Sequence, residues 1–584
     1  MKIKHLFGLA VIAAMTASCS SNEDLGTAGP GTGTNETGVG YATFTINLPS
    51  VSGTRADAGG AEMNEGTKEE YAVKSATALI FQKYGADEGS NKFVESVTLP
   101  IDGWTDDPED GITTTSKKLV AKLTNVDTKN DYSVLILLNN TKVALPTVGQ
   151  SYNDWNSKNI LTPSVTDWTG SDGFYMANAP LKGSGASPAI LVPINKDKIY
   201  ASEAIAKEDA SECAATVFVE RGVAKMSVAD PTPTDPIKVK DKATKAETES
   251  TVKFNNWALD ITNKKTYAVH NIDGLESDFG DIWKTDPSNR FIGTNNRVYW
   301  GKDPNYDNKD LKLTDKDAER KAEFNFITAT SQIDKDFANT TNTNPVYCLE
   351  NTFNLTNMYQ GQTTRVIFKA KYAPKDDAGN SLADDDETFY TIGNMTTILN
   401  TDKLKAAVNA VANPVLPAGY TIDYTNFMMK EGSHVITLAD IKDADGKPLV
   451  AGTDYSGKTG TVIVDEINTK LGLTDGGGRA EAKVGINTYL QGVTYYIARV
   501  KHFGDALTKW NSGESYSANN KQYLGRYGML RNNWYELTVG NVYGPGYPGV
   551  PPVDPTLPDD ENEKYLSVSV KILSWAKRSQ SVDL

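Results

Sequence analysis

The sequence predicts an all-β protein built from antiparallel β-sandwiches with few short helices. Short runs of β-branched and aromatic residues recur along the chain, turn residues separate them, and strands do not alternate regularly with long helices. Examples are Ala78–Phe81, Tyr132–Leu138 and Val217–Val228. At 584 residues the chain is too long for one ordinary core, so we expect two domains.

The domain boundary is predicted from a proline-rich stretch. Residues 230–236 read DPTPTDP, which cannot lie inside a sheet, and a polar segment follows. We therefore place an N-terminal sandwich at 56–235 and a C-terminal sandwich at 250–545. One helix is predicted at about 402–412, where apolar residues fall at helical spacing before two prolines.

The N-terminus has the pattern of an export signal. Two lysines precede the apolar run Leu6–Met15, and small residues lead to Cys19. A cysteine at this place is the lipid acceptor of bacterial lipoproteins, so we expect residues 1–18 to be a signal peptide and Cys19 to carry palmitate and the other lipid chains. Thr16 stands where such signals usually have Leu, which leaves a plain signal peptide as the alternative.

Residues 19–55 are interpreted as a propeptide. A polar tether leads to a predicted strand at 41–49, and a low-complexity loop containing Arg55 joins that strand to the body. The loop should be accessible to proteases. The apolar side chains expected on one face of the strand are Ala42, Phe44, Ile46 and Leu48.

The C-terminus carries a second separable strand. Residues 546–584 begin with a Pro- and acid-rich linker, expected to be extended and mobile, and continue into a strand at 565–573. Behind such a linker the strand has no obvious partner in its own domain. Its apolar face comprises Leu566, Val568, Val570 and Ile572.

Two separable strands meet the requirements of β-strand addition, in which one chain completes the sheet of another. If a cut at Arg55 removed the first strand, a groove would open that the C-terminal strand of the next copy could fill. Donor and acceptor are different surfaces, so the contact need not close into a ring and permits an open fibre.

Composition excludes several functions. The net charge of −15 argues against nucleic acid, and four histidines leave little material for metal or acid–base chemistry. We therefore expect no cofactor, no metal and no enzymatic activity. Cys213 and Cys348 are far apart, and isolated buried thiols are favoured over a disulfide, although their state stays open.

Two motifs are interpreted as coincidences. Residues 452–459 read GTDYSGKT and match the phosphate-binding loop, but the following β-branched residues 461–465 predict a strand where a helix is needed. Residues 303–310 resemble a calcium loop but lack its glycine and glutamate, so we expect a polar surface turn.

The aromatic and histidine residues are given structural roles. His270, His434 and His502 lack sequence neighbours at metal or triad spacing, which favours packing or surface roles. Trp534 and Tyr535 could form a glycan platform, but within a strand pattern they are more often core.

Several segments resemble the fimbrillins of Bacteroidales, in particular the major-subunit family of the short fimbriae. In the first half the resemblance is carried by LPSVSGTRADAG, YSVLILLNN, GFYMANAP, VERGVAKMSV and NNWALDITNKKTY. In the second half it continues through YCLENTF, GVTYYIARVKHFG, YLGRYGMLRNNWYELTV and SVSVKILSWAKRSQSVDL. It covers essentially the whole chain.

The resemblance implies an outer-membrane lipoprotein precursor with two transthyretin-like β-sandwich domains. It implies cleavage by a trypsin-like, Arg-specific protease at Arg55, with Ala56 as the mature N-terminus, lipid on Cys19 and 565–584 as the donor segment. The implied partners are other copies of the chain and accessory tip and anchor subunits, and host or bacterial surface ligands stay open. The mature form would lie in extracellular fimbriae and support adhesion and biofilm formation. The alternative is a non-polymerising surface-binding lipoprotein, such as a fimbrial tip, an anchor or a glycan-binding protein.

Overall fold

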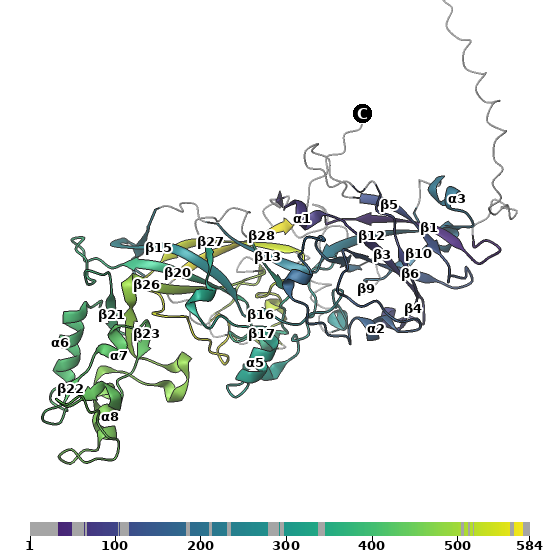
Figure 1. Ribbon diagram of the computed structural model, residues 1–584. Coiled ribbons are helices and arrows are strands. Elements are labelled where there is room, and N and C mark those ends of the chain that lie inside the picture. The colour runs from purple at the N-terminus through teal and green to yellow at the C-terminus, as the bar shows by residue number, and fades with distance from the viewer. Residues whose placement is uncertain are drawn as a thin grey trace, which may run out of the picture.

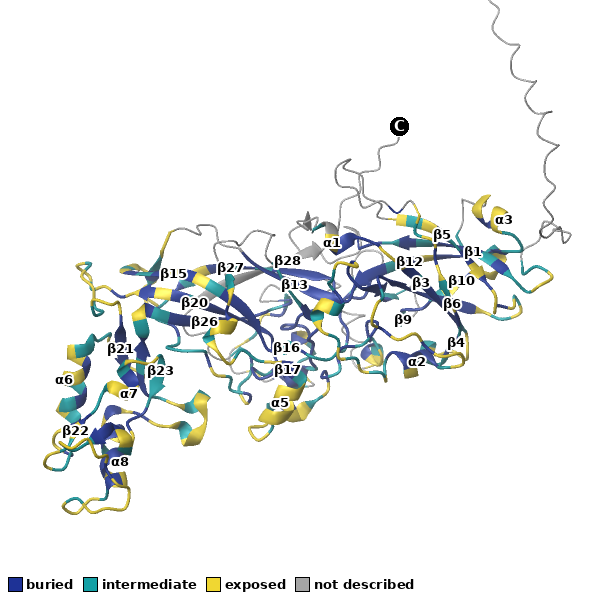
Figure 2. Ribbon diagram, in the orientation of Figure 1, coloured by how far each residue is buried: buried dark blue, intermediate teal, exposed yellow. Residues whose placement is uncertain are grey.

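The computed structural model is an elongated, mainly β protein, as the sequence predicts (Figure 1). The structure describes residues 33–49, 63–64, 67–102, 104, 116–182, 187–208, 213–229, 235–277, 291–292, 297–336, 345–503, 507–511, 514, 516–517, 519–560 and 566–575, with backbone alone for 63–64, 68 and 566–575. Sheets run along its length, and buried residues line their facing sides (Figure 2).

A nine-stranded sheet forms the N-terminal part in the order β11-β1-β12-β7-β6-β3-β4, with β10 on β6 and β5 on β1. Its core contains the fully buried strand β6 and the inward side chains of its neighbours. The strands are β1 Gly40–Asn47, β3 Ala76–Gln82, β4 Lys92–Thr98, β5 Ser116–Leu123, β6 Tyr132–Leu138, β7 Met176–Asn178, β10 Val192–Ile194, β11 Ile199–Tyr200 and β12 Ala215–Arg221.

Two five-stranded sheets form the central part and share a second core. One has the order β19-β13-β27-β28-β2: β19 Val346–Leu349, β13 Val223–Ala229, β27 Asn533–Val542, β28 Leu566–Trp575 and β2 Met63–Asn64. The other contains β14 Ile237–Lys240, β15 Glu247–Asp260, β18 Lys335–Asp336, β20 Arg365–Ala373 and β26 Val493–Arg499. Side chains from both sheets meet in this core, including Met226, Trp257 and Tyr535.

The chain passes from the first sheet to the second at Gly222, between β12 and β13. A Cβ atom at this residue would lie 2.6 Å from the indole ring of Trp168, so glycine is required by close packing. The change of sheet comes before the proline-rich stretch at 230–236. The domain division at 235 stays a prediction.

A smaller unit lies at the end of the molecule remote from β1 (Figure 1). Its three-stranded sheet contains β21 Phe389–Ile392, β25 Ile486–Tyr489 and β23 Gly432–His434, and the helices are α6 Thr401–Ala412, α7 Thr425–Met428 and α8 Gly460–Leu471. The predicted helix at 402–412 is confirmed by α6.

The predicted strand at 461–465 is wrong, because these residues lie in α8. The Thr459 side chain accepts the N–H of Val462 at the N-terminus, and Gly472 ends the helix in the left-handed conformation. Apolar residues at helical spacing, such as Ile463 and Ile467, are buried in the unit's core. Tertiary burial of this face outweighs the strand preference of the β-branched residues.

Short elements complete the described chain. The helices are α1 Lys68–Tyr71, α2 Tyr152–Trp155, α3 Glu203–Glu208 and α5 Asp317–Glu323. The short strands are β8 Leu181–Lys182, β9 Pro188–Ala189, β16 Thr262–Asn263, β17 Phe324–Asn325, β22 Thr421–Ile422 and β24 Ile441–Lys442.

A buried ion pair fixes α1 to the central part. The Lys225 ammonium on β13 lies 2.7 Å from the Glu70 carboxylate, and both side chains are fully buried. The Tyr347 hydroxyl donates to the same carboxylate, while Lys225 also lies over the Trp534 ring. Burial alone would raise the pKa of Glu70, but the charges of Lys225 and Arg221 hold that pKa below its ordinary value.

We expect Lys225→Met to lower the free energy of unfolding by about 3–5 kcal/mol, because it leaves a buried carboxylate without its cation. Chemical denaturation measures this. The matched control is Lys158→Met, which removes an exposed i,i+4 pair with Asp154 and should cost less than about 1 kcal/mol. Equal small losses in both variants would contradict the role given to the buried pair, and Glu70→Gln added to Lys225→Met should recover part of the loss.

Candidate functional site

The predicted first strand exists as β1 and is paired along both edges. On one edge it runs antiparallel to β5 over its whole length, from Gly40 opposite Leu123 to Asn47 opposite Ser116. On the other edge β11 pairs with its first half and β12, in parallel, with residues 44–47. β1 is therefore an interior strand of the first sheet.

The inward side chains of β1 are core residues. Ala42, Phe44 and Ile46 have no solvent exposure and Leu48 has 3%. All four belong to the first hydrophobic core. Burial of a large apolar side chain contributes about 1.5–3 kcal/mol, so β1 adds substantially to the stability of the N-terminal part.

The outward face of β1 is held by two hydroxyl groups. The Thr43 hydroxyl donates to the carbonyl oxygen of Ala206 on α3 at 2.8 Å, and the Thr45 hydroxyl lies 2.6 Å from the Cys213 thiol. Thr43 itself is only 9% exposed. Helix α3 and Cys213 therefore cover part of the outward face of β1 as well.

The predicted processing residues Arg55 and Ala56 lie outside the described residues, as does the predicted lipid site Cys19. The described chain resumes at β2 and then at Thr67, whose N–H donates to the Glu70 carboxylate at 2.9 Å. The ion-paired helix α1 is thus the first side-chain anchor after β1 among the described residues.

The C-terminal strand exists as β28, but the expectation that it lacks a partner in its own chain is wrong. It runs antiparallel to β27, from Asn533 opposite Ser574 to Val542 opposite Leu566. Its far end also pairs in parallel with β2. The predicted donor side chains of Leu566, Val568, Val570 and Ile572 lie outside the described side chains.

The linker before β28 packs against the body over 546–560, whereas the sequence predicted an extended, mobile segment. The Arg365 guanidinium donates to the carbonyl oxygens of Pro551 and Pro552, and Arg526 lies 2.7 Å from the Asp560 carboxylate. Asp559 is fully buried, and burial raises its pKa to about 6 despite the nearby Arg499. Composition suggested disorder, but buried arginines bind the carbonyls and carboxylates that make the segment polar.

The phosphate-loop match at 452–459 precedes a helix, so the reason first given against it is wrong. The structure supplies a different one, because the first N–H groups of α8 already have acceptors within the chain. Gly460 and Thr461 donate to the carbonyls of Thr453 and Ala451, and Lys458 pairs with Glu466. The described segment between β24 and α8 also contains no strand. Nothing here cradles a phosphate.

The histidines and the calcium-like loop have structural partners within the chain. His270 lies 2.7 Å from Glu220, His434 2.9 Å from Asp440 and His502 2.8 Å from the Tyr535 hydroxyl. Asp303 is 4% exposed and accepts hydrogen bonds from Asn263 and Thr352, so the expected surface turn is wrong there.

Other features among the described residues give no further sign of chemistry. His, Cys, Asp and Glu side chains do not gather in threes as metal ligands over the described ranges. Trp534 and Tyr535 are fully buried, as a core role requires.

None of the helices that the structure describes is long and apolar enough to cross a membrane.

Both described cysteines are free thiols: Cys348 is buried, and burial raises its pKa to about 12, whereas Cys213 is only half-buried.

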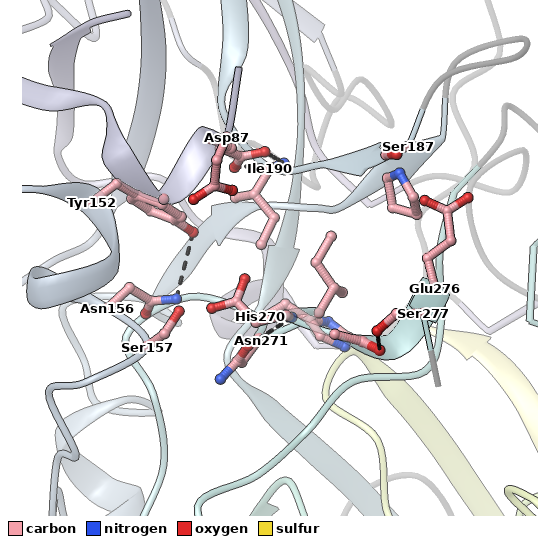
Figure 3. A pocket seen from close by; sticks show the side chains of 16 residues that line it. Asp87, Tyr152, Asn156, Ser157, Ser187, Ile190, His270, Asn271, Glu276 and Ser277 are labelled. Atoms are coloured by element: carbon pink, nitrogen blue, oxygen red, sulfur yellow. Dashed lines mark hydrogen bonds between the residues drawn. The ribbon is translucent and has the colours of Figure 1, made fainter. Parts of the chain in front are cut away.

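A polar cavity of about 260 Å³ lies between the segment at 87–89, helix α2 and the loop at 270–277 (Figure 3). Glu88 on its wall accepts the backbone N–H groups of Ile190 and Leu191, and burial raises the pKa of this carboxyl to about 7. Tyr152 and His270 also line it. No sequence pattern pointed to this cavity, because its walls come from separate segments.

We expect Asp560→Ala to destabilise the protein by about 3–5 kcal/mol, because it leaves the buried Arg526 guanidinium without its carboxylate. Hydrogen exchange should then accelerate in residues 546–560 before the rest of the chain. The control Asp445→Ala removes the exposed pair with Lys447 and should change stability by less than about 1 kcal/mol. Unchanged exchange in 546–560 would contradict the anchoring role.

Comparison with known proteins gives one family match. Residues 487–581 match the family model described as major fimbrial subunit protein type IV, fimbrillin, C-terminal. No curated protein matches the sequence.

Similar solved structures come from Parabacteroides and Bacteroides species. A candidate cell adhesion protein from Parabacteroides distasonis ATCC 8503 is 10% identical, with 92% of this chain and 99% of that chain covered and a TM-score of 0.38. Another from Bacteroides eggerthii DSM 20697 is 11% identical, with 91% and 96% covered and a TM-score of 0.31. A fimbrial assembly protein from Parabacteroides distasonis ATCC 8503 is 13% identical, with 39% and 66% covered and a TM-score of 0.22. At such TM-scores the likeness carries no argument about function. The family match thus covers the C-terminal region, residues 487–581, which is similar to the C-terminal part of the fimbrillin major fimbrial subunits.

Proposed function

We propose that this chain is a structural subunit of bacterial surface fimbriae, of the short-fimbria major-subunit type, that polymerises by protease-triggered strand exchange. The observation that carries the proposal is the position of β1, which lies in the interior of the first sheet. Its covalent connection to the body runs through the segment that contains Arg55. The family match at the C-terminus supports the fimbrial role.

Loss of β1 would leave a groove that demands a new strand. β5 on one side and β11 and β12 on the other would expose unpaired backbone groups, and the core would lose the side chains of Phe44 and Ile46. Unpaired edges next to an apolar slot are the acceptor that strand addition requires. The groove is therefore a binding site made by cleavage.

The anchoring of α1 supports a cut at Arg55. A cut there separates β1 from the chain but leaves Glu70 and its ion pair with Lys225 in the body. In this proposal a trypsin-like, Arg-specific protease makes the cut and Ala56 becomes the new N-terminus. Cys19 carries the lipid that holds the precursor at the outer membrane, and the processed chain is extracellular.

The proposed donor is the C-terminal strand of the next copy. Leu566, Val568, Val570 and Ile572 would replace the inward side chains of β1. Because β28 pairs with β27 in its own chain, it must leave that partner before it can be donated. Other partners in this proposal are accessory tip and anchor subunits, and adhesion ligands on host or bacterial surfaces.

One observation favours the second candidate, a surface lipoprotein that binds without polymerising. The self-pairing of β28 completes the sheet of its own chain, which is the arrangement expected of a subunit that donates nothing. The interior position of β1 behind the Arg55 loop has no explanation in that function, so we prefer the polymerising one.

We expect Arg55→Ala to abolish filaments and to leave a full-length lipidated precursor, because the groove never opens. Electron microscopy of surface filaments and N-terminal sequencing of the extracted protein measure this. Lys68→Ala is the matched control, since Lys68 begins the anchored helix α1 and should not be a processing site. Normal filaments from Arg55→Ala would contradict the cleavage step.

The Cys213 thiol should report the state of the groove. It lies against Thr45 of β1 and should react slowly with a maleimide in the precursor. Labelling should accelerate at least tenfold in cleaved monomer from which residues 566–584 have been deleted, and slow again in wild-type filaments. Cys348, 1% exposed, is the internal control and should stay unlabelled throughout. A constant Cys213 rate would mean that β1 does not leave.

A further inference from the structure

The outward contacts of β1 define what an incoming strand must reproduce, given the proposed function on which this inference rests. We propose that the C-terminal strand of a second copy enters the groove in the direction of β1 and in a single register. Leu566 takes the place of Ala42, and Ile572 takes the place of Leu48. Ser567 and Ser569 then take the places of the two threonines on the outward face.

The hydroxyl groups are the first reason for this register. Thr43 donates to the Ala206 carbonyl and Thr45 contacts the Cys213 thiol. Each of these two outward-facing positions therefore has a polar partner that remains in the groove after β1 leaves. In the proposed register Ser567 meets Ala206 and Ser569 meets Cys213. Both buried or half-buried partners are satisfied again, which avoids the cost of leaving them unpaired.

Slipped registers in the same direction are unfavourable because they place polar or charged side chains at buried positions. A slip of two residues one way puts Lys564 at the fully buried position of Ala42. A slip of two the other way puts Ser574 at the 3% exposed position of Leu48. A slip of one residue turns the serines and Lys571 into the core.

A strand that enters in the reverse direction places a lysine at a buried position. It puts Lys571 at the position of Thr43, which is 9% exposed, or, after a slip of two residues, Lys564 at the position of Leu48. The proposed direction instead leaves Lys571 at the half-buried Asn47, beside the exposed Ser116 on β5.

The four inward side chains of the incoming strand match those of β1 in total volume, although the large and small residues come in a different order. Leu566 is larger than Ala42, whereas Val568 is smaller than Phe44. The two positions are neighbours on the same face, so Leu566 can extend into space that the Phe44 ring vacates. Changes that keep the total apolar volume are the ones that cores tolerate best.

The register is tested with the native Cys213 as the acceptor thiol. Filaments assembled from S569C protein should, under mild oxidation or with a short thiol cross-linker, give a ladder of covalent multimers on non-reducing gels. The ladder should disappear in S569C/C213A. K571C lies two residues further along on the same outward face and should give at least fivefold less product. A ladder from K571C in place of S569C would overturn the register.

Direction is tested in a C213A background with the β5 residue Ser116, which lies opposite Asn47. S116C/K571C should cross-link between subunits, and S116C/S567C should not. The reverse result would overturn the direction. Absence of any ladder in filaments of normal length would overturn the inference as a whole.

Failure of this inference and failure of the proposed function are distinguishable. If removal of residues 566–584 abolishes filaments, but the cross-linked multimers form from K571C in place of S569C, only the register is wrong. If filaments persist after that removal, the proposed function fails as well. Since the removal also strips β27 of a partner, filament loss counts only where circular dichroism shows a folded monomer.

Discussion

The pairing of β1 on both edges is the constraint on which the proposed assembly depends. An edge strand can leave a sheet and expose one row of backbone groups, but an interior strand leaves two rows and a slot between them. β1 joins β5 to β11 and β12, and its side chains close the first core. The N-terminal part is therefore complete only while some strand occupies this position.

The interior of the molecule is held by charges as well as by apolar packing. Glu70 pairs with Lys225 and fixes α1, and Asp560 pairs with Arg526 and fixes the segment before β28. Removing one partner of a buried ion pair costs more free energy than the intact pair contributes to stability. Such pairs therefore serve mainly to hold the paired segments in place. β28 thus follows a segment whose place in the fold is fixed, and α1 is the first helix described after β1.

Sequence patterns predicted the fold where the information is local. The alternation in 41–49 gave β1, and the spacing of Leu404 and Val408 gave α6, because each element buries one regular face. The helix α8 was missed because its β-branched residues favour a strand locally while their burial in the third core decides otherwise. The partner of β28 and the arginines around 551–560 come from distant segments, which periodicity cannot reveal.

The anchored segment before β28 has a mechanical consequence. In a filament, tension on a donated strand would enter the body through Asp560 and the prolines before it. There it meets Arg365 on β20, Arg499 beside Asp559, and Arg526. These contacts distribute the force over two strands and a loop of the central sandwich. Several contacts of the core therefore bear the force before the backbone hydrogen bonds between any one pair of strands must break.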